Sequence, residues 1–297
     1  TQGYRENSKF KSDIFNFDIS FLKDQTTRYF AKLNYSEQLT EIPGNITLTD
    51  FYTRPRYSRT PEDFGTEKVN AISIGSQNIL DSGNKFSNVF KFEDKDQTTS
   101  ALSGGRYILA KTNLETATLS SKLTKKQRFN NLDLKSKLGI DFFNSAYRAI
   151  GNDWYQNKYH NIASQNIIEP FGIFEFNHSS NEKIDYEIGF RYHYYELDTD
   201  NYTTKTSLSS DDRQNYAWSL GANYNLQNGQ KLFTHVSRAY RSPRLDEIIS
   251  LIKPSPSHTH IKHQYSNDIE LGYEVNVERK RYKASIFRTL IKNQIYL

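Results

Sequence analysis

The stretch from Tyr216 to Ile295 decides the fold, and it reads YAWSLGANYNLQNGQKLFTHVSRAY, RSPRLDEIISLIKPSPSHTHIKHQYS and NDIELGYEVNVERKRYKASIFRTLIKNQI. From Tyr216 to Leu226 every second residue is apolar or aromatic, and the residues between are small or polar. From Asp268 to Glu278 an apolar face again alternates with a mostly acidic one. A period of two is the pattern of a β-strand with one apolar face. We therefore interpret the stretch as two hairpins joined by one long loop.

The same alternation recurs along the rest of the chain. It predicts strands at 15–21, 29–35, 68–79, 85–93, 111–124, 131–148, 167–177 and 184–194. Short turns are expected at 23–26, 81–84, 125–130 and 179–182, and long loops at 43–67, 94–110, 149–164 and 199–212. With the opening stretch, this makes about twelve strands that alternate between short turns and long loops, the layout of outer-membrane β-barrels.

Strand length supports this fold class. Many of the predicted strands exceed the five or six residues usual in soluble sheets, and a tilted strand of about 9 to 11 residues crosses a bilayer. We therefore predict an all-β, antiparallel transmembrane β-barrel. A soluble β-sandwich or propeller is the alternative, but its strands would be shorter and its connections need not alternate.

Composition excludes several classes of protein. No run of the chain approaches the roughly 18 to 20 apolar residues of a membrane-spanning helix. Cysteine is absent, which excludes disulfides, thiol catalysis and zinc-thiolate sites. The formal net charge of +5 is mild and the basic residues are scattered among acids, so nucleic acid is not an expected partner. The chain has no phosphate-binding glycine loop, H-E-x-x-H or G-x-S-x-G, and we do not expect an enzyme.

Three strings near the end of the chain carry a resemblance to a known family. LGANYNL, SRAYRSPRLDEI and NDIELGYE follow one another in an order that resembles the late barrel strands of the TonB-dependent receptors of the Gram-negative outer membrane. The family motif matches at Arg241, Pro243, Glu247, Glu270 and Gly272. The resemblance implies a barrel of about twenty-two strands around an N-terminal plug, and the import of a scarce iron chelate with energy supplied through TonB.

The resemblance also sets the expected domain organisation and partners. Thr1 opens the chain without a signal peptide, and Leu297 ends it in strand-like sequence. We expect residues 1–297 to form one partial barrel domain, truncated at both ends, with the plug and the TonB-contacting segment outside it. The implied partners are outer-membrane lipid, the TonB complex through the plug, and a small iron chelate bound by a monomer in the outer membrane. No cofactor is expected, because iron or haem would be transported ligand only.

Charges and rings on the strands have structural and functional interpretations. Aromatic residues such as Tyr192, Tyr194, Tyr216 and Trp218 fit the girdles at membrane interfaces. Inward charges line either a transport path or, as we favour, a cross-paired wall: Asp133, Lys135, Lys137, Asp185, Glu187, Arg191, Asp268, Glu270 and Glu274. Arg241 and Glu247 are expected to form a structural anchor through an arginine–carboxylate pair, with direct ligand contact as the alternative.

Three histidines in the loop after this motif are candidate ligands for a metal or haem iron. His258, His260 and His263 form His-x-His-x-x-His, a spacing that can present several imidazoles to one ion. Haem receptors of the family carry a second short box nearby, but the sequence Thr259 to Lys262 stands in its place. A polar loop with unrelated histidines is the alternative.

A basic and aromatic group in the first long loop is the remaining candidate. Arg54, Arg56, Tyr57 and Arg59 suit an anionic or catecholate ligand through charge and stacking, and Trp154 lies in the loop predicted at 149–164. A solvated loop is the alternative. The sequence thus favours a receptor for a ferric siderophore or similar iron chelate. A haem or divalent-metal receptor, a passive porin-like channel and a soluble β-rich binding protein are the alternatives.

Overall fold

The computed structural model describes residues 3–80, 83–103, 105–152, 158–178, 184–201, 206–208, 213–226, 229–248, 261–277 and 280–295. Its strands are β1 (Phe10–Leu22), β2 (Thr27–Glu41), β3 (Phe64–Ile79), β4 (Lys85–Ser103), β5 (Arg106–Phe129), β6 (Leu132–Asn152), β7 (Lys158–His178), β8 (Ile184–Asn201), β9 (Thr206–Leu208), β10 (Arg213–Asn225), β11 (Gln230–Arg241), β12 (Gln264–Val277) and β13 (Lys280–Lys292). Two short helices, α1 (Leu48–Thr53) and α2 (Leu245–Ile248), lie in connections. No helix in these ranges is both long and apolar enough to cross a membrane.

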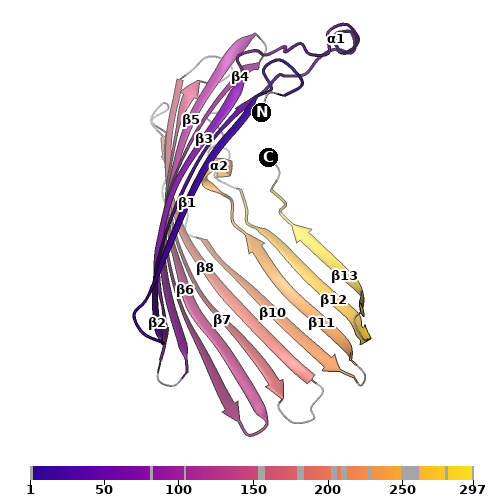
Figure 1. Cartoon of the computed structure of the whole chain (residues 1–297). Coiled ribbons are helices and arrows are strands. Elements are labelled where there is room, and N and C mark those ends of the chain that lie inside the picture. Colours follow the sequence, from indigo (N-terminus) through magenta and orange to yellow (C-terminus); the bar gives the residue numbers. More distant parts are fainter. Residues whose placement is uncertain are drawn as a thin grey trace.

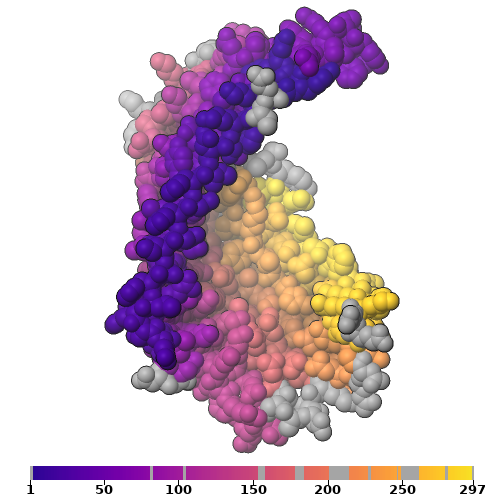
Figure 2. Space-filling model, in the orientation of Figure 1, coloured from indigo at the N-terminus to yellow at the C-terminus, as the bar shows by residue number. Residues whose placement is uncertain are grey.

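The strands form one antiparallel sheet that follows chain order. Each neighbour pairs with the next from β1 to β8 and on through β10 to β13, while the short β9 pairs with β8 off this path. The sheet is strongly curved and unclosed, with β1 and β13 at its two free edges (Figure 1). The space-filling view shows the concave side as a broad hollow between these edges (Figure 2). The prediction of about twelve antiparallel strands forming an all-β barrel wall is confirmed for the described residues.

The strand register shows which residues lie on the same face of the sheet. Tyr216, Trp218 and Leu220 on β10 lie opposite Tyr192, Phe190 and Ile188 on β8, and all six are well exposed on the convex face. The residues between them face the concave side, where α2 lies (Figure 1). Exposed apolar side chains on the convex face and polar ones on the concave face are expected of a barrel that meets lipid outside and a polar lumen inside.

Tyrosines mark the two borders of the convex apolar face. They recur eight residues apart on three strands, as the pairs Tyr186 and Tyr194, Tyr216 and Tyr224, and Tyr265 and Tyr273. At about 3.4 Å per residue, each pair spans roughly 27 Å along its strand. An outer-membrane barrel carries an apolar band about 25 Å tall between aromatic girdles, so the spacing suits two girdles.

The long loops predicted at 94–110 and 149–164 are wrong in extent. β4 and β5 meet near Ser103 and Arg106, and β6 and β7 continue to Asn152 and from Lys158. β8 likewise reaches Asn201, and β3 begins at Phe64 inside the loop predicted at 43–67. Beyond the tyrosine row farther from the short turns, the convex face no longer carries an apolar band, so the side chains no longer alternate although the backbone ladder continues. The predicted turn at 179–182 lies outside the described residues.

Glycines lie directly opposite phenylalanines at four places in the sheet, which are Phe30 and Gly75, Phe171 and Gly139, Phe190 and Gly172, and Phe233 and Gly272. In each pair a Cβ added to the glycine would lie under 3 Å from the ring. A ring thus covers the backbone where the opposite residue has no side chain, an arrangement that fixes strand register. The motif residue Gly272 is therefore needed for the close approach of Phe233.

We expect Gly272→Ala to destabilise the barrel by about 1–2 kcal/mol, because the new methyl group would displace the Phe233 ring, now 2.1 Å from that position. Urea unfolding of the receptor in lipid vesicles measures this. Combining Gly272→Ala with Phe233→Leu should cost less than the sum of the single changes. Gly221→Ala is the matched control on the same face, since the nearest atom to its Cβ is 3.7 Å away. An additive double variant would contradict the Phe–Gly contact.

Candidate functional site

The segment after β11 folds back onto the concave face of the sheet. Helix α2 lies on the concave side of the sheet (Figure 1). Its Leu245 and Ile248 are each 5% exposed, and they pack on buried residues of β6, β7 and β8. The cluster comprises Tyr147, Ala149, Tyr159, Ala163, Tyr195, Leu197, Leu245 and Ile248. Burial of these side chains provides the main apolar stabilisation that fixes α2 inside the hollow. The chain between β11 and α2 is thereby held against the lumen wall.

The residues from Ser242 to Ile248 are called the anchored segment below, and Glu247 makes its main polar contacts. Its side chain is 1% exposed, and its carboxylate pairs with the guanidinium of Arg241. It also accepts a hydrogen bond from the backbone N–H of Arg244 at 2.8 Å. A glutamate that reaches back to the amide preceding a helix is one half of a capping box. Glu247 therefore both starts α2 and ties it to the end of β11.

A second polar group connects the same segment to β7 and β8. The imidazole of His193 is almost fully buried, with Nδ1 2.7 Å from Glu169 Oε1 and Nε2 2.8 Å from Ser242 Oγ. The same Ser242 oxygen lies 3.0 Å from His263 Nδ1. The Tyr240 hydroxyl donates to Glu169 at 2.9 Å. We call Glu169, His193, Tyr240, Ser242 and His263 the buried polar network.

Glu169 occupies a break in the sheet. The β7–β8 pairing passes from Ile168↔Tyr194 to Phe171↔Arg191 without pairing Glu169 or Pro170. Proline has no N–H to donate to a ladder, which accounts for an interruption here. The Arg191 guanidinium donates to Glu169 and, at 2.8 Å, to Asp141. Side-chain bonds therefore connect the two strands where backbone bonds are missing.

Most other inward charges on the wall are paired across strands. Glu175 accepts from Lys135 at 2.7 Å and from Lys137 at 2.6 Å. Asp133, Glu270 and Glu274 lie beside Arg128, Lys283 and Arg281, at 3.6, 3.8 and 2.7 Å. Asp185 and Asp268 accept hydrogen bonds from Asn225 and from Thr289. The ion pairs favour the interpretation of Asp133, Lys135, Lys137, Glu270 and Glu274 as a cross-paired wall.

A cavity of about 310 Å³ lies between the anchored segment and the wall. Ser242, Pro243 and Arg244 border it on one side, and Gln97 and Gln165 lie among the wall residues on the other. The Arg244 side chain is 60% exposed. The cavity therefore offers amides, hydroxyls and one accessible guanidinium inside the upper lumen.

The first long loop is pinned by residues that precede β1. Arg5 donates to the carbonyls of Gly44 at 2.7 Å and Tyr57 at 2.9 Å. Asn7 donates to the carbonyls of Thr60 at 2.7 Å and Asp63 at 2.9 Å. The loop and α1 project beyond the sheet at the end opposite the short turns (Figure 1). These bonds hold the loop in one conformation over the rim of the hollow.

The three candidate arginines of this loop differ in whether their charge is already paired within the protein. Arg54 donates to Asp50 at 2.7 Å, lies 3.8 Å above the Tyr57 ring, and holds the pKa of Asp50 below its usual range together with the Thr47 hydroxyl. Arg56 lies 5.4 Å from the Tyr4 ring. Among the described residues, neither Arg56 nor Arg59 forms an ion pair. Both remain exposed at the rim, so they can meet an anion.

Other predicted site residues are dispersed. Trp154, His258 and His260 lie outside the described residues. His263 is buried in the polar network, away from the loop cations. Glu270 and Gly272 lie on β12 in the wall. Within the described ranges, no group of three His, Asp or Glu gathers to hold a metal ion.

Sequence reasoning missed Arg5, Asn7, Glu169, His193 and Ser242. Only Ser242 lay within a recognised motif. The partners of Arg5 and His193 are more than twenty residues away in the chain, so no local spacing signals these contacts.

The curved sheet, its convex apolar band between tyrosine rows and its polar hollow define the wall of a transmembrane β-barrel. A family model described as "TonB dependent receptor-like, beta-barrel" matches residues 2–297. The chain belongs to this family of TonB-dependent receptors. A sequence search of curated proteins finds no match.

Solved structures share the fold at low identity. The ferric citrate transporter FecA in its unliganded form is 14% identical with a TM-score of 0.86, over 99% of this chain and 45% of that one. The ferric-catecholate import receptor Fiu from E. coli K12, closed form, is 13% identical with a TM-score of 0.76, over 98% and 52%. The copper transporter OprC is 14% identical with a TM-score of 0.76, over 96% and 46%. The chain thus spans about half the length of these structures.

We expect Arg241→Ala to destabilise the α2 segment by about 2–3 kcal/mol, because it leaves the buried Glu247 carboxylate without its main cation. This is less than for a fully buried pair, since Arg241 is 39% exposed. Hydrogen exchange of peptides covering 241–248 in the receptor measures the local opening. The matched control is Arg244→Ala, which keeps the backbone donor and removes only the longer 3.6 Å contact of a 60% exposed guanidinium with Glu247, so it should cost under about 1 kcal/mol. Equal effects of the two changes would contradict the anchor.

Proposed function

We propose that this chain forms part of the barrel wall of an outer-membrane receptor that takes up a ferric siderophore or a similar iron chelate with energy supplied through TonB. The main observation behind this proposal is that two exposed arginines, Arg56 and Arg59, lie on a loop that Arg5 and Asn7 hold over the rim of the hollow. Two exposed guanidinium groups on one held loop suit a chelate with carboxylate or catecholate oxygens. Family membership and the neighbours that import ferric citrate and ferric catecholates support the proposal.

The geometry supports a sequence of two contacts for the ligand. The loop arginines attract the anionic chelate, and the exposed Tyr52 and Phe51 beside them offer aromatic faces for stacking. The cavity beside the anchored segment, with Arg244 and the two glutamines, then receives it inside the lumen. The family implies that a plug, moved by TonB, opens the remaining path. Iron is substrate in this scheme, and the family and fold are those of transport receptors rather than enzymes.

A divalent-metal or haem substrate is the second candidate within the same family. The copper transporter OprC shares the fold, which favours keeping a metal as a test ligand. His263 is already hydrogen-bonded in the buried polar network, so haem or metal capture would depend on His258 and His260. A passive porin-like channel is disfavoured by family membership, since the family's transport is energised.

We expect Arg56→Ala/Arg59→Ala to weaken binding of an anionic ferric chelate by about 10- to 30-fold, as each lost contact between an exposed guanidinium and the anion costs about 0.7–1 kcal/mol. Tryptophan quenching of the full-length receptor in detergent measures this with ferric citrate, a ferric catecholate and haemin. Arg54→Ala is the matched control, because its charge is already paired with Asp50. It should change affinity by less than about threefold.

Two results would overturn the proposal. Haemin or copper quenching that is lost only in His258→Ala/His260→Ala would identify a haem or metal receptor. Chelate binding that is indifferent to Arg56 and Arg59 would remove the loop from the binding site.

A further inference from the structure

Ser242, His193 and Glu169 of the buried polar network form one chain of hydrogen bonds that links a hydroxyl, an imidazole and a carboxylate. Ser242 Oγ lies 2.8 Å from Nε2 of His193, and Nδ1 of the same imidazole lies 2.7 Å from Oε1 of Glu169. Both distances fall within the roughly 2.6 to 3.2 Å over which a base can take a proton from a nucleophile. Serine, histidine and a carboxylate in this order have the geometry of the triad of serine hydrolases, which recurs on unrelated folds.

The charge of Glu169 decides which nitrogen of His193 carries the proton. The Arg191 guanidinium donates to the Glu169 carboxylate, so this carboxylate is ionised and acts only as an acceptor. Nδ1 of His193 must therefore donate to it, which leaves Nε2 to accept the hydroxyl proton of Ser242. His263 Nδ1, 3.0 Å from the same hydroxyl oxygen, then donates to that oxygen. The hydroxyl is thus held with its proton directed at a base, which is the arrangement that activates a serine.

The Ser242 hydroxyl belongs to a residue that borders a cavity. Ser242 is half-buried and lines the space of about 310 Å³ between the anchored segment and the wall, whereas His193 is only 2% exposed. Sites for small ligands begin at about this volume. Arg244 borders the same cavity, and its 60% exposed guanidinium can stabilise negative charge that develops on a carbonyl oxygen. A ligand in the cavity would therefore meet a nucleophile and a cation, while the base is shielded from bulk water.

The anchored segment fixes the position of Ser242. Leu245 and Ile248 are buried against the wall, and the pair of Arg241 with Glu247 closes the chain around α2. Pro243, which is buried directly after Ser242, restricts the backbone further. A nucleophile held in place before its substrate arrives loses little freedom on reaction, which lowers the barrier.

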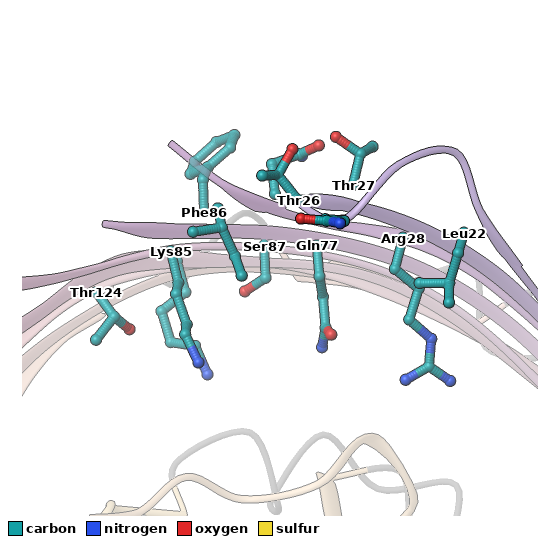
Figure 3. A pocket seen from close by; sticks show the side chains of 13 residues that line it. Leu22, Thr26, Thr27, Arg28, Gln77, Lys85, Phe86, Ser87 and Thr124 are labelled. Carbon is teal, nitrogen blue, oxygen red and sulfur yellow. The ribbon is translucent and has the colours of Figure 1, made fainter. Parts of the chain in front are cut away.

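Other serines that border cavities on the hollow side lack a base. Ser145 on β6 borders the same cavity as Ser242, but its hydroxyl lies 3.3 Å from that of Thr116. Ser87 on β4 projects from the concave side into a cavity of about 370 Å³ at the turn end (Figure 3). None of the described residues that border this second cavity is a histidine. The arrangement around Ser242 is therefore not a general property of serines in this wall.

We propose that Ser242 accepts the acyl group of a labile carboxylic ester that enters the cavity, with His193 as general base and Glu169 as a positioning residue. Ser242 Oγ bonds to the carbonyl carbon as its proton passes to His193 Nε2. The bond from that carbon to the alkoxy oxygen then breaks, and this oxygen takes the proton from Nε2 and leaves as an alcohol. A water molecule releases the acyl group as a carboxylic acid by the same route, and its second proton returns through Nε2 to Oγ. The reaction goes beyond transport and needs no energy from TonB.

Covalent labelling of the full-length receptor in detergent tests the proposal. A fluorophosphonate probe should form one adduct, located on Ser242 by mass spectrometry of peptides, and p-nitrophenyl acetate should release a burst of p-nitrophenolate. His193→Gln should slow labelling by about 100-fold, since a general base contributes about 10²- to 10⁴-fold. Ser145→Ala and Ser87→Ala are the matched controls, because they remove hydroxyls that border a cavity without a base, and they should leave labelling unchanged.

The pH dependence of labelling separates the positioning role of Glu169 from a structural one. Groups that face or adjoin the His193 imidazole are Glu169, Arg191, Tyr195, Tyr240, Ser242 and His263. Labelling of the wild type should fall in acid, because a protonated imidazole cannot accept the serine proton. Glu169→Gln should slow labelling by about tenfold or more and move this fall to lower pH, since it removes the carboxylate that stabilises the imidazolium. His193→Gln should abolish the pH dependence.

Three results would overturn the inference: a wild-type receptor that the probe leaves unlabelled, equal labelling of Ser242, Ser145 and Ser87, or labelling of Ser242 that His193→Gln does not slow. The comparison of the three serines uses the wild type alone, so it stands even if a variant fails to fold. Hydrogen exchange of peptides covering 241–248 shows whether each variant keeps the anchored segment. Labelling does not depend on the chelate that the receptor takes up, so failure of this inference leaves the proposed function standing, and the reverse also holds.

Discussion

The antiparallel hydrogen-bond ladder is the constraint on which this structure depends. A strand in lipid must find a backbone partner for every amide, because an unsatisfied group there costs several kcal/mol. The ladder also fixes the face of the sheet on which each side chain lies, since a slip of one residue would turn every apolar side chain towards the lumen. The opposed phenylalanines and glycines, such as Phe233 and Gly272, oppose such a slip. Where the ladder breaks at Pro170, Glu169 gathers side-chain donors from β8 and β11, so polar bonds replace the missing backbone ones.

Sequence patterns predicted the fold well where two solvents meet the sheet. Between the tyrosine rows, one face is apolar and the other polar, so the alternation from Tyr216 to Tyr224 reports the strand directly. Beyond the tyrosine row farther from the short turns, the convex face is polar too, so a strand such as β4 has no contrast to reveal it. On β7 the residues that are apolar there, such as Ala163, pack on the concave face against α2 and do not alternate with a lipid-facing row. A sequence such as that around Gln97 is compatible with a loop and with a sheet in water. The predicted loops failed there for that reason, while the number and pairing of strands did not depend on those segments.

The candidate site was predictable only where its contacts are local. Arg241 and Glu247 are six residues apart, and their pairing follows from a motif that one segment contains. The buried polar network instead brings together residues of β7, β8 and β11 with Ser242 after β11 and His263 before β12, and no spacing in the sequence connects them. Arg5 reaches carbonyls about fifty residues away, so it looks like an ordinary terminal arginine in the sequence. Charges on the wall could be placed on a face by parity, but the pairing of Lys135 and Lys137 with Glu175 required the register of neighbouring strands.

Because the strands extend beyond the tyrosine rows, the sequence of the loops can change independently of the strands that lie in the membrane. β8 continues for seven residues past Tyr194, so the connecting loops stand on a stiff, hydrogen-bonded stem rather than at the membrane surface. Loop residues can then be exchanged, inserted or deleted without exposing a backbone amide to lipid. New recognition chemistry arises at the tips while insertion and folding of the embedded part stay the same. One barrel wall can in this way carry different loops, which agrees with neighbours that share this fold at 13–14% identity.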